Sequence, residues 1–187
     1  MAFASPAVAD EQTMPHNSGG GWYNDGSGEG SSNPTIVNCQ FIENMARNGG
    51  AMINLGTDAG EASPQLINCE FLGNSAANRG GAMVNDANNG GTSSPECINC
   101  IFSGNKCNQD GGAVFNSSSS GGRSRPDFIN CSFNGNLAVD NGGAMYNNAT
   151  GAQQNSSNTA PRIGNSIFWN NAATIGNVFL NRKTGGS

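Results

Sequence analysis

Charged residues are scarce in this sequence of 187 residues. Only 11% of the residues are Asp, Glu, Lys or Arg, whereas an ordinary globular domain contains about a quarter. A helical domain with many Glu and Lys residues is therefore not expected. The 8 Lys and Arg residues leave a net charge of −5, which argues against a surface for nucleic-acid phosphates. No apolar run approaches the roughly 18 residues of a membrane span, so we expect no membrane-spanning segment.

The composition also raises the question of disorder. Gly accounts for 28 residues, Asn and Ser are abundant, and hydrophobic residues make up only 35%. Disordered chains share this low hydrophobicity, but they usually carry a high net charge and lack regularly placed apolar residues. Here the apolar residues recur at fixed intervals. We therefore expect a folded chain whose core is built from a repeat.

The repeat has a period of about 31 residues. Its clearest marks are Gly-Gly pairs that start at Gly49, Gly80, Gly111 and Gly142. A unit reads roughly Pro-x-Ile-Ile-Asn-Cys-x-Phe-x-x-Asn-x-Ala and, after a few polar residues, Gly-Gly-Ala-Met-x-Asn. Half-units at 19–24 and 176–181 flank the complete ones. One such unit cannot bury its own apolar side, so copies stacked in register share a continuous core, as in a solenoid.

Each unit is expected to contain only strands and loops. Positions 37, 39 and 41 alternate with a period of two, which predicts a strand with one buried face. The Gly-Gly-Ala-Met segment predicts a second strand, whose small residues let the next turn approach closely. A weaker strand or bend is expected between Asn44 and Gly49. Polar segments predict loops, where a binding surface would most readily lie, at 54–64, 85–95, 116–126 and 147–161.

Stacking places equivalent residues of successive units in columns. Asn side chains in a column can hydrogen-bond along it, and Asn tolerates the left-handed backbone of a sharp bend. We predict a structural ladder, with a row of polar ligand groups as the alternative, at Asn44, Asn74, Asn105, Asn136 and Asn171. The predicted core columns contain Cys39, Cys69, Cys100, Cys131, Phe41, Phe71, Phe102, Phe133 and Phe168. A further core column contains Met52, Met83, Val114 and Met145.

Six cysteines would ordinarily suggest disulfides in an exported protein. Four of them share one column, where parallel side chains have poor disulfide geometry. Ser166 fills the same position in the last unit, which favours a packing role. Cys97 and Cys107 occupy other core positions, and the sequence leaves open whether they form a bridge. A zinc site needs clustered Cys or His, and the only histidine, His16, lies outside the repeats, so we expect no metal and no cofactor.

No catalytic site is expected. Parallel β-helices that cleave polysaccharides carry rows of Asp, Arg and Lys on one face, whereas the aspartates here fall mostly in loops at different repeat positions: Asp58, Asp86, Asp110, Asp127 and Asp140. No two are expected at the separation that glycoside hydrolysis needs. The arginines predict at most a weak anion patch, formed on the loop side by Arg123, Arg125 and Arg162.

The ends of the chain carry the remaining signals. We expect residues 1–18 to be a tail or a degenerate capping turn, 19–181 to form the solenoid, and 182–187 to be a tail. Ala7-Val8-Ala9 before Asp10 has the form of a cleavage site for export or organelle-lumen targeting, with a flexible tail as the alternative. The aromatic residues expected at the surface are Trp22, Tyr23, Tyr146 and Trp169. Of these, Trp22 and Trp169 lie in terminal units, where they would cover an end or anchor a neighbour.

The two recurring motifs point to a family. Asn-Cys-x-Phe-x-x-Asn and Gly-Gly-Ala followed by Ile, Leu, Val or Met resemble the repeats of right-handed parallel β-helix proteins, especially the chlamydial polymorphic outer membrane protein type and related bacterial surface proteins. The resemblance covers about 19–181 and implies a right-handed parallel β-helix, here of about five to six turns. It also implies secretion, display at the cell surface and adhesion. The lumen of an organelle such as the thylakoid, or the periplasm, is the alternative location.

These features predict a non-enzymatic scaffold or adhesion module that makes protein–protein contacts. Open solenoid ends present unpaired strand edges, which need a cap or a partner. We therefore expect the chain to be a fragment or a subunit of a larger surface or lumenal assembly, bound to its partners through the open ends or the variable loops. The alternative function is a carbohydrate-binding or polysaccharide-cleaving β-helix.

Overall fold

The computed structural model describes residues 2–3, 18–150 and 158–184. Over these residues the chain forms an all-β parallel solenoid of about five turns with a period of about 31 residues, which confirms the predicted fold class. The described residues contain no helix and therefore none that could cross a membrane. Every strand pairing between successive turns in these ranges is parallel, so each turn repeats the path of the one before it.

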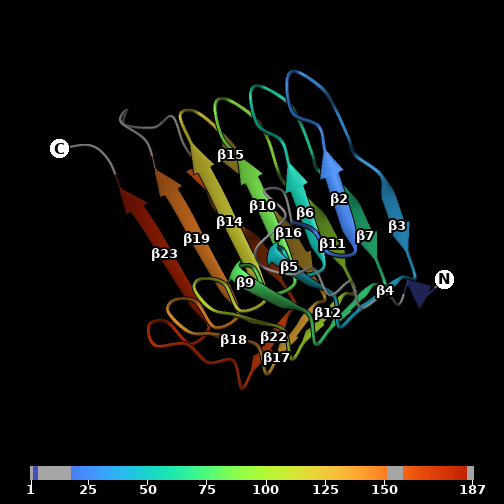
Figure 1. Ribbon diagram of the computed structural model, residues 1–187, viewed down its shortest axis with the longest axis vertical. Coiled ribbons are helices and arrows are strands. Elements are labelled where there is room, and N and C mark those ends of the chain that lie inside the picture. The colour runs from blue at the N-terminus through green and yellow to red at the C-terminus, as the bar shows by residue number, and fades with distance from the viewer. Residues whose placement is uncertain (1, 4–17, 151–157, 185–187) are drawn as a thin grey trace.

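Two six-stranded sheets are the largest elements (Figure 1). The β2–β23 sheet contains β2 (Trp22–Asp25), β6 (Met52–Leu55), β10 (Met83–Ala87), β14 (Val114–Ser119), β19 (Met145–Thr150) and β23 (Phe179–Thr184). The β1–β22 sheet contains β1 (Ala2–Phe3), β4 (Gln40–Ile42), β8 (Glu70–Leu72), β12 (Ile101–Ser103), β17 (Ser132–Asn134) and β22 (Ile167–Trp169). Strands β2 and β23 therefore lie at opposite edges of one sheet.

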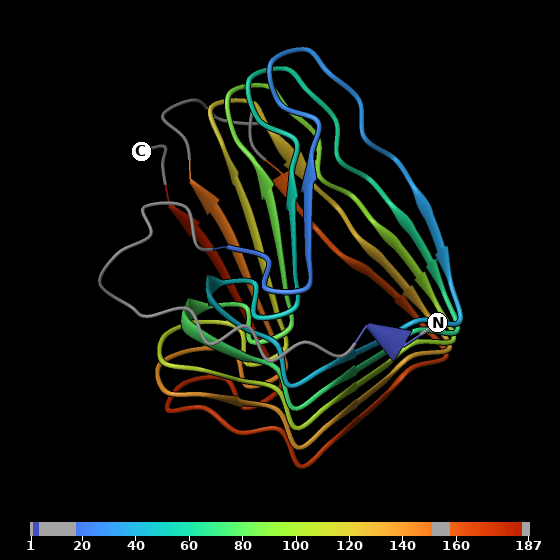
Figure 2. The same cartoon turned by 45° about the vertical axis from the view of Figure 1, so that its right-hand side comes forward.

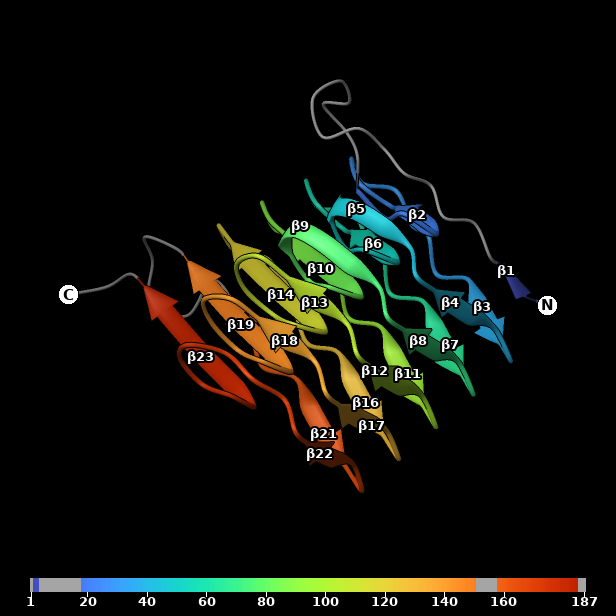
Figure 3. The same ribbon diagram turned by 60° about the horizontal axis from the view of Figure 1, so that its bottom comes forward.

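Three smaller sheets complete the turns. The β3–β21 sheet contains β3 (Thr35–Val37), β7 (Gln65–Ile67), β11 (Glu96–Ile98), β16 (Asp127–Ile129) and β21 (Arg162–Gly164). The β5–β18 sheet contains β5 (Met45–Asn48), β9 (Ser75–Arg79), β13 (Lys106–Cys107) and β18 (Leu137–Ala138). A two-stranded sheet pairs β15 (Arg123–Ser124) with β20 (Asn158–Thr159). The turns overlie one another in Figure 2, and Figure 3 shows the strands of each sheet as parallel rows.

The core lies between these sheets and consists of the predicted columns. Phe rings of successive turns stack with their centroids 4.6 to 4.8 Å apart and their planes within 6° of parallel. Met52, Met83, Val114 and Met145 form a second buried column in register with one another. Because each apolar side chain is covered by its counterparts above and below, the core is continuous along the solenoid axis.

One expectation about the strands was wrong. Residues 37, 39 and 41 do not alternate within one strand, because Asn38 adopts a positive φ of 55° and separates β3 from β4. The bend reverses the inward and outward positions. Ile36 and Phe41 are buried, whereas Val37 is 45% exposed. The same left-handed bend recurs one turn later at Asn68 and then at Asn99, Asn130 and Asn165.

The predicted loops are more regular than expected. Bridges connect Ser31 with Glu61, Glu61 with Thr92, and Thr92 with Arg123, so the loop segments also stack in register. Ala62, Ser93 and Ser124 are completely buried within them. These segments therefore extend the solenoid wall instead of forming free surface loops.

Described strands are also present on both sides of the range 19–181. At the first turn, β1 pairs in parallel with β4, and Phe3 stands opposite Phe41. Of the predicted tail or capping turn at 1–18, Ser18 forms a bridge with Asn48, and residues 1 and 4–17, including His16, lie outside the described residues. At the other end, β23 continues to Thr184 and pairs with β19 along its whole length. The strand therefore runs three residues past the expected boundary at 181.

Candidate interaction surface

The predicted Asn ladder is present in the interior. The backbone N–H and the Nδ2 of Asn74 donate to Oδ1 of Asn105 over 3.0 and 2.9 Å, and Asn105 donates in the same way to Asn136. The Nδ2 of Asn105 also donates to the carbonyl of Phe71 over 2.9 Å. The five ladder residues are at most 7% exposed. Their amide groups bind one another and the backbone, so the ladder joins turns and is closed to an external ligand.

Two further Asn ladders follow the other repeated asparagines. One runs through the β2–β23 sheet and is buried except at its last member, which is exposed. Each Nδ2 donates to the next Oδ1 over 2.7 to 3.1 Å, at Asn24, Asn54, Asn85, Asn116, Asn147 and Asn181. The other follows the left-handed bends on the outside, at Asn38, Asn68, Asn99 and Asn130. Two of the three Asn ladders thus provide hydrogen bonds in the interior, and the third follows the bends of the backbone.

All six cysteines are free thiols. Cys69, Cys100 and Cys131 are buried in their column, and Cys39 at the first turn is half-buried. Cys97 and Cys107 belong to separate core clusters. Burial raises the pKa of both these thiols, to about 12 for Cys107. Neutral, buried thiols behave as small apolar groups, so the cysteines pack the core.

Two ion pairs are present in the described part of the chain. Arg162 makes a bidentate contact with Asp127, with Nε and Nη2 at 3.1 and 2.7 Å from the carboxylate oxygens. Arg79 lies 3.8 Å from Asp110, and its guanidinium stands 5.0 Å from the centre of the Phe115 ring. No group of three His, Cys, Asp or Glu residues in the described ranges is placed to hold a metal ion. Arg162 was expected in the loop-side anion patch, but its charge is paired with Asp127.

Asp86 is a carboxylate of the described residues whose surroundings disfavour its charge. It lies on β10, and Asn88 donates to it from the same strand end. Burial raises the pKa of Asp86 from 3.8 to about 6, although the charge of Arg79 opposes the shift. Ionised Asp86 is therefore unfavourable in the folded state, because desolvation penalises the charged form.

The stability of the protein should depend on the ionisation of Asp86. Because the pKa is higher in the folded state than in the unfolded state, the folded state binds the proton more tightly, and the contribution of Asp86 worsens as the pH rises from 4 through 6. Asp86→Asn should therefore be more stable than the wild type at neutral pH by about 3 kcal/mol, with no advantage below about pH 4. Urea unfolding of both proteins across this range measures the difference. If the difference in free energy of unfolding between the two proteins stays constant with pH, the pKa of Asp86 is not raised in the folded state.

The largest exposed apolar side chains lie on the last turn, which we define as residues 158–184. On the outer face of β22, Trp169 is 72% and Ile167 is 66% exposed. We call these two residues the outer patch. The preceding turn has polar residues at both positions, since Ser132 pairs with Ile167 and Asn134 with Trp169. The last turn thus replaces polar groups by large apolar ones on a surface that faces solvent.

The other predicted aromatic residues have different surroundings. Trp22 occupies the Met column of the first turn and packs, partly buried, against the main core. Tyr146 was expected at the surface, but it is only 2% exposed, because it packs with Ile53, Val84 and Phe115 in a second apolar cluster on the outer side of the β2–β23 sheet. Tyr23 is 49% exposed, as expected.

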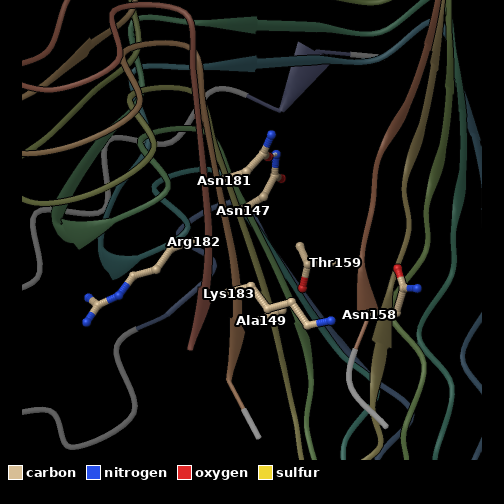
Figure 4. Close-up of a pocket in the computed structure, with 7 residues that line it drawn as sticks. All are labelled: Asn147, Ala149, Asn158, Thr159, Asn181, Arg182 and Lys183. Atoms are coloured by element: carbon tan, nitrogen blue, oxygen red, sulfur yellow. Dashed lines mark hydrogen bonds between the residues drawn. The ribbon is translucent and has the colours of Figure 1, made fainter. Parts of the chain in front are cut away.

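A pocket of about 180 Å³ opens at the last turn (Figure 4). It is lined by Asn147, Ala149, Asn158, Thr159, Asn181, Arg182 and Lys183. The side chains of Arg182 and Lys183 point in opposite directions, with Lys183 toward Thr159 and Asn158. Ala149 stands one turn before Lys183, and Ser118 precedes Ala149 in the same column. The pocket therefore marks the unfilled interior of the last turn.

The sequence did not single out Ile167, Arg182 or Lys183. The signal was available in the columns, because Ile167 follows Ser132 and Lys183 follows Ala149. At the Lys183 position the earlier turns carry the small residues Ala87, Ser118 and Ala149. The Ile167 position faces outward in the earlier turns as well, and its column already varies between polar residues and Ile101.

Comparison with known proteins adds no relative. No family model, no curated protein and no solved structure matches the chain. The likeness to chlamydial surface repeats therefore rests on the motifs of the sequence alone.

Proposed function

We propose that this protein is a non-enzymatic scaffold that binds another protein through the outer patch. The observation that carries the proposal is the exposure of Trp169 and Ile167 at positions that are polar one turn earlier. Exposed apolar side chains gathered at one place commonly mark an interaction site, and Trp is the residue most enriched among those that dominate binding.

The solenoid holds this patch rigidly. Strand β22 pairs with β17, and Phe168, between the two patch residues, stacks on Phe133 with a centroid distance of 4.6 Å. The patch backbone is therefore fixed before binding, and little conformational entropy is lost when a partner covers it. A rigid rod with an anchor at one end suits a spacer or a subunit of a larger assembly.

We place this assembly outside the cytoplasm, at the cell surface, with an organelle lumen or the periplasm as the alternative. The support is the resemblance of the repeats to those of bacterial surface proteins. The burial of five of the six free thiols is compatible with an oxidising compartment, since buried thiols are shielded from oxidants. Adhesion is then contact between the outer patch and a protein on a facing surface.

Affinity capture tests the proposal. The double variant I167S/W169S should lose at least about tenfold of the captured partner, because truncation of a central aromatic anchor typically costs 2 kcal/mol or more. The matched control is M45S/V139S, which removes two apolar side chains that are 47% and 52% exposed on other turns. Thermal unfolding should show that both variants remain folded.

Two results would contradict the proposal. Equal capture by the patch variant and the control would show that the outer patch is not the binding site. Binding of a polysaccharide by the wild type and both variants alike, with no captured protein, would favour a carbohydrate-binding role.

A further inference from the structure

We infer that copies of this chain associate head to tail, with β23 of one copy pairing in parallel with β2 of the next. This inference goes beyond the outer patch and uses a different surface, the edges of the β2–β23 sheet. Strands β2 and β23 are the first and last in that sheet, and no described strand pairs with the other side of either one. The strand directions agree, so the next copy continues the solenoid without a change of geometry.

The columns make the two edges complementary. Each column runs through all six strands, so the register of the known pairings fixes which residues would meet. Phe179 would stand next to Trp22, Leu180 next to Tyr23, and Asn181 next to Asn24. The aromatic and apolar members are partly exposed in the single copy, with Tyr23 at 49% and Phe179 at 36%. Head-to-tail pairing buries them against side chains of the same kind.

The buried Asn ladder favours this direction of assembly. Within one copy each Nδ2 donates toward the following turn, as from Asn147 to Oδ1 of Asn181 over 2.7 Å. In the same sense, Nδ2 of Asn181 would donate to Oδ1 of Asn24 in the next copy. That oxygen already accepts a hydrogen bond from Ser32, and a carbonyl oxygen can accept two.

Charge is distributed in opposite senses at the two ends. The first turn, residues 18–48, carries Asp25, Glu29 and Glu43 against Arg47. The last turn carries only Arg162, Arg182 and Lys183, with no Asp or Glu within 158–184. In the continued register Arg182 stands beside Asp25, since both belong to one column. Two last turns facing each other would bring like charges together, so a symmetric dimer is disfavoured.

The pocket fits the same arrangement. Lys183 lies in the column that Ala87, Ser118 and Ala149 fill in earlier turns. Gly26 lies beyond Asp25 at the corresponding place in the first turn. The backbone at Gly26 packs closely against the carbonyl of Glu61 on the interior side. In the continued register the backbone of the first turn would therefore stand next to Lys183 and cover the pocket. In the β1–β22 sheet the corresponding edge strands of the described residues are β1, which pairs with β4, and β22.

An interface between unlike ends does not close on itself when the copies are related by translation along one axis. Head-to-tail association therefore yields an open series of dimers, trimers and longer rods. Light scattering or sedimentation of the full chain over a wide concentration range should show mass increasing without a limit at the dimer.

Charge reversal tests the contact between Arg182 and Asp25. We expect Asp25→Arg and Arg182→Asp each to weaken self-association by about tenfold or more, because like charges then face each other across the interface. An equimolar mixture of the two variants should associate again, since every contact then joins opposite charges. The control variants Asp140→Arg and Arg125→Asp make the same charge changes at exposed positions of inner turns and should associate like the wild type.

The outcomes separate this inference from the proposed function. A chain that stays monomeric at all concentrations, a mass that stops at the dimer, or a mixture that fails to associate would overturn the inference. Capture of a different protein through the outer patch would still support the scaffold role. Conversely, rods that form from I167S/W169S as well as from the wild type would support head-to-tail association alone.

Discussion

Replacing Asn105 by alanine should lower the free energy of unfolding by about 3 kcal/mol. Asn105 is completely buried in the third turn and accepts hydrogen bonds from the backbone N–H and Nδ2 of Asn74. Alanine removes both acceptor contacts, and the buried N–H of Asn74 is left without a partner. The carbonyl of Phe71 also loses the hydrogen bond from Nδ2. Urea unfolding followed by far-ultraviolet circular dichroism measures the loss.

The control for this prediction is Asn134→Ala on the next turn. Asn134 lies in β17 with its side chain exposed, so the same substitution should change the free energy of unfolding by less than about 0.5 kcal/mol. If both variants unfold at the same urea concentration as the wild type, the ladder does not hold the turns together.

Replacing Gly81 by alanine should be at least as damaging. A Cβ atom at this position would lie 2.1 Å from the carbonyl oxygen of Gly112 and 2.6 Å from the backbone nitrogen of Lys106. Both are backbone atoms of the neighbouring turn, so they cannot rotate away, and the two turns must separate. We expect a loss of about 3 kcal/mol or more, or failure to fold. Yield of soluble protein and the thermal midpoint report the effect.

Gly164→Ala is the matched control. A Cβ atom there meets nothing within 4 Å, and the residue does not have a positive φ. This substitution should be neutral, or stabilising by up to about 1 kcal/mol, because alanine restricts the unfolded chain. Equal destabilisation by the two substitutions would mean that loss of glycine flexibility, and not contact between turns, is responsible.

The columns of the fold could be predicted because the repeat is nearly exact. Once Gly-Gly pairs and Phe residues recur at one interval, stacking fixes their neighbours without any knowledge of the path between them. This explains why the Phe column, the Met column and the first Asn ladder were found from the sequence. Cys107 was assigned correctly for the same reason, since it pairs with Ala76 and Ala138.

The path within a turn could not be read from the columns. Asn38 and Asn44 are both repeated asparagines, yet the first bends the backbone on the surface and the second binds in the interior. Their difference depends on where the chain turns, which a column does not record. The burial of Tyr146 was missed because the outer side of the β2–β23 sheet carries a second apolar cluster with Ile53, Val84 and Phe115, a feature that no alternation pattern reveals.

The interaction surface could be predicted only with knowledge of which side chains other residues cover. Trp22 and Trp169 both belong to terminal units, but Trp22 packs on the core and Trp169 projects outward. Their positions in the repeat contain this information, because Trp22 pairs with buried Met52 and Trp169 with exposed Asn134. Comparing each terminal residue with its own column would have separated them.

The repeat period is longer at the last turn, and this has a practical consequence for inserting a foreign peptide into the chain. Ladder partners are 31 residues apart from Asn116 to Asn147, whereas Arg162 pairs with Asp127 across 35 residues. The additional residues fall between β19 and β21, and the columns on either side stay in register. The number of residues in a turn is therefore fixed only within the segments that pair with a neighbouring turn. A peptide epitope or a tag grafted at this arc would be presented on a rod without disturbing its stacking.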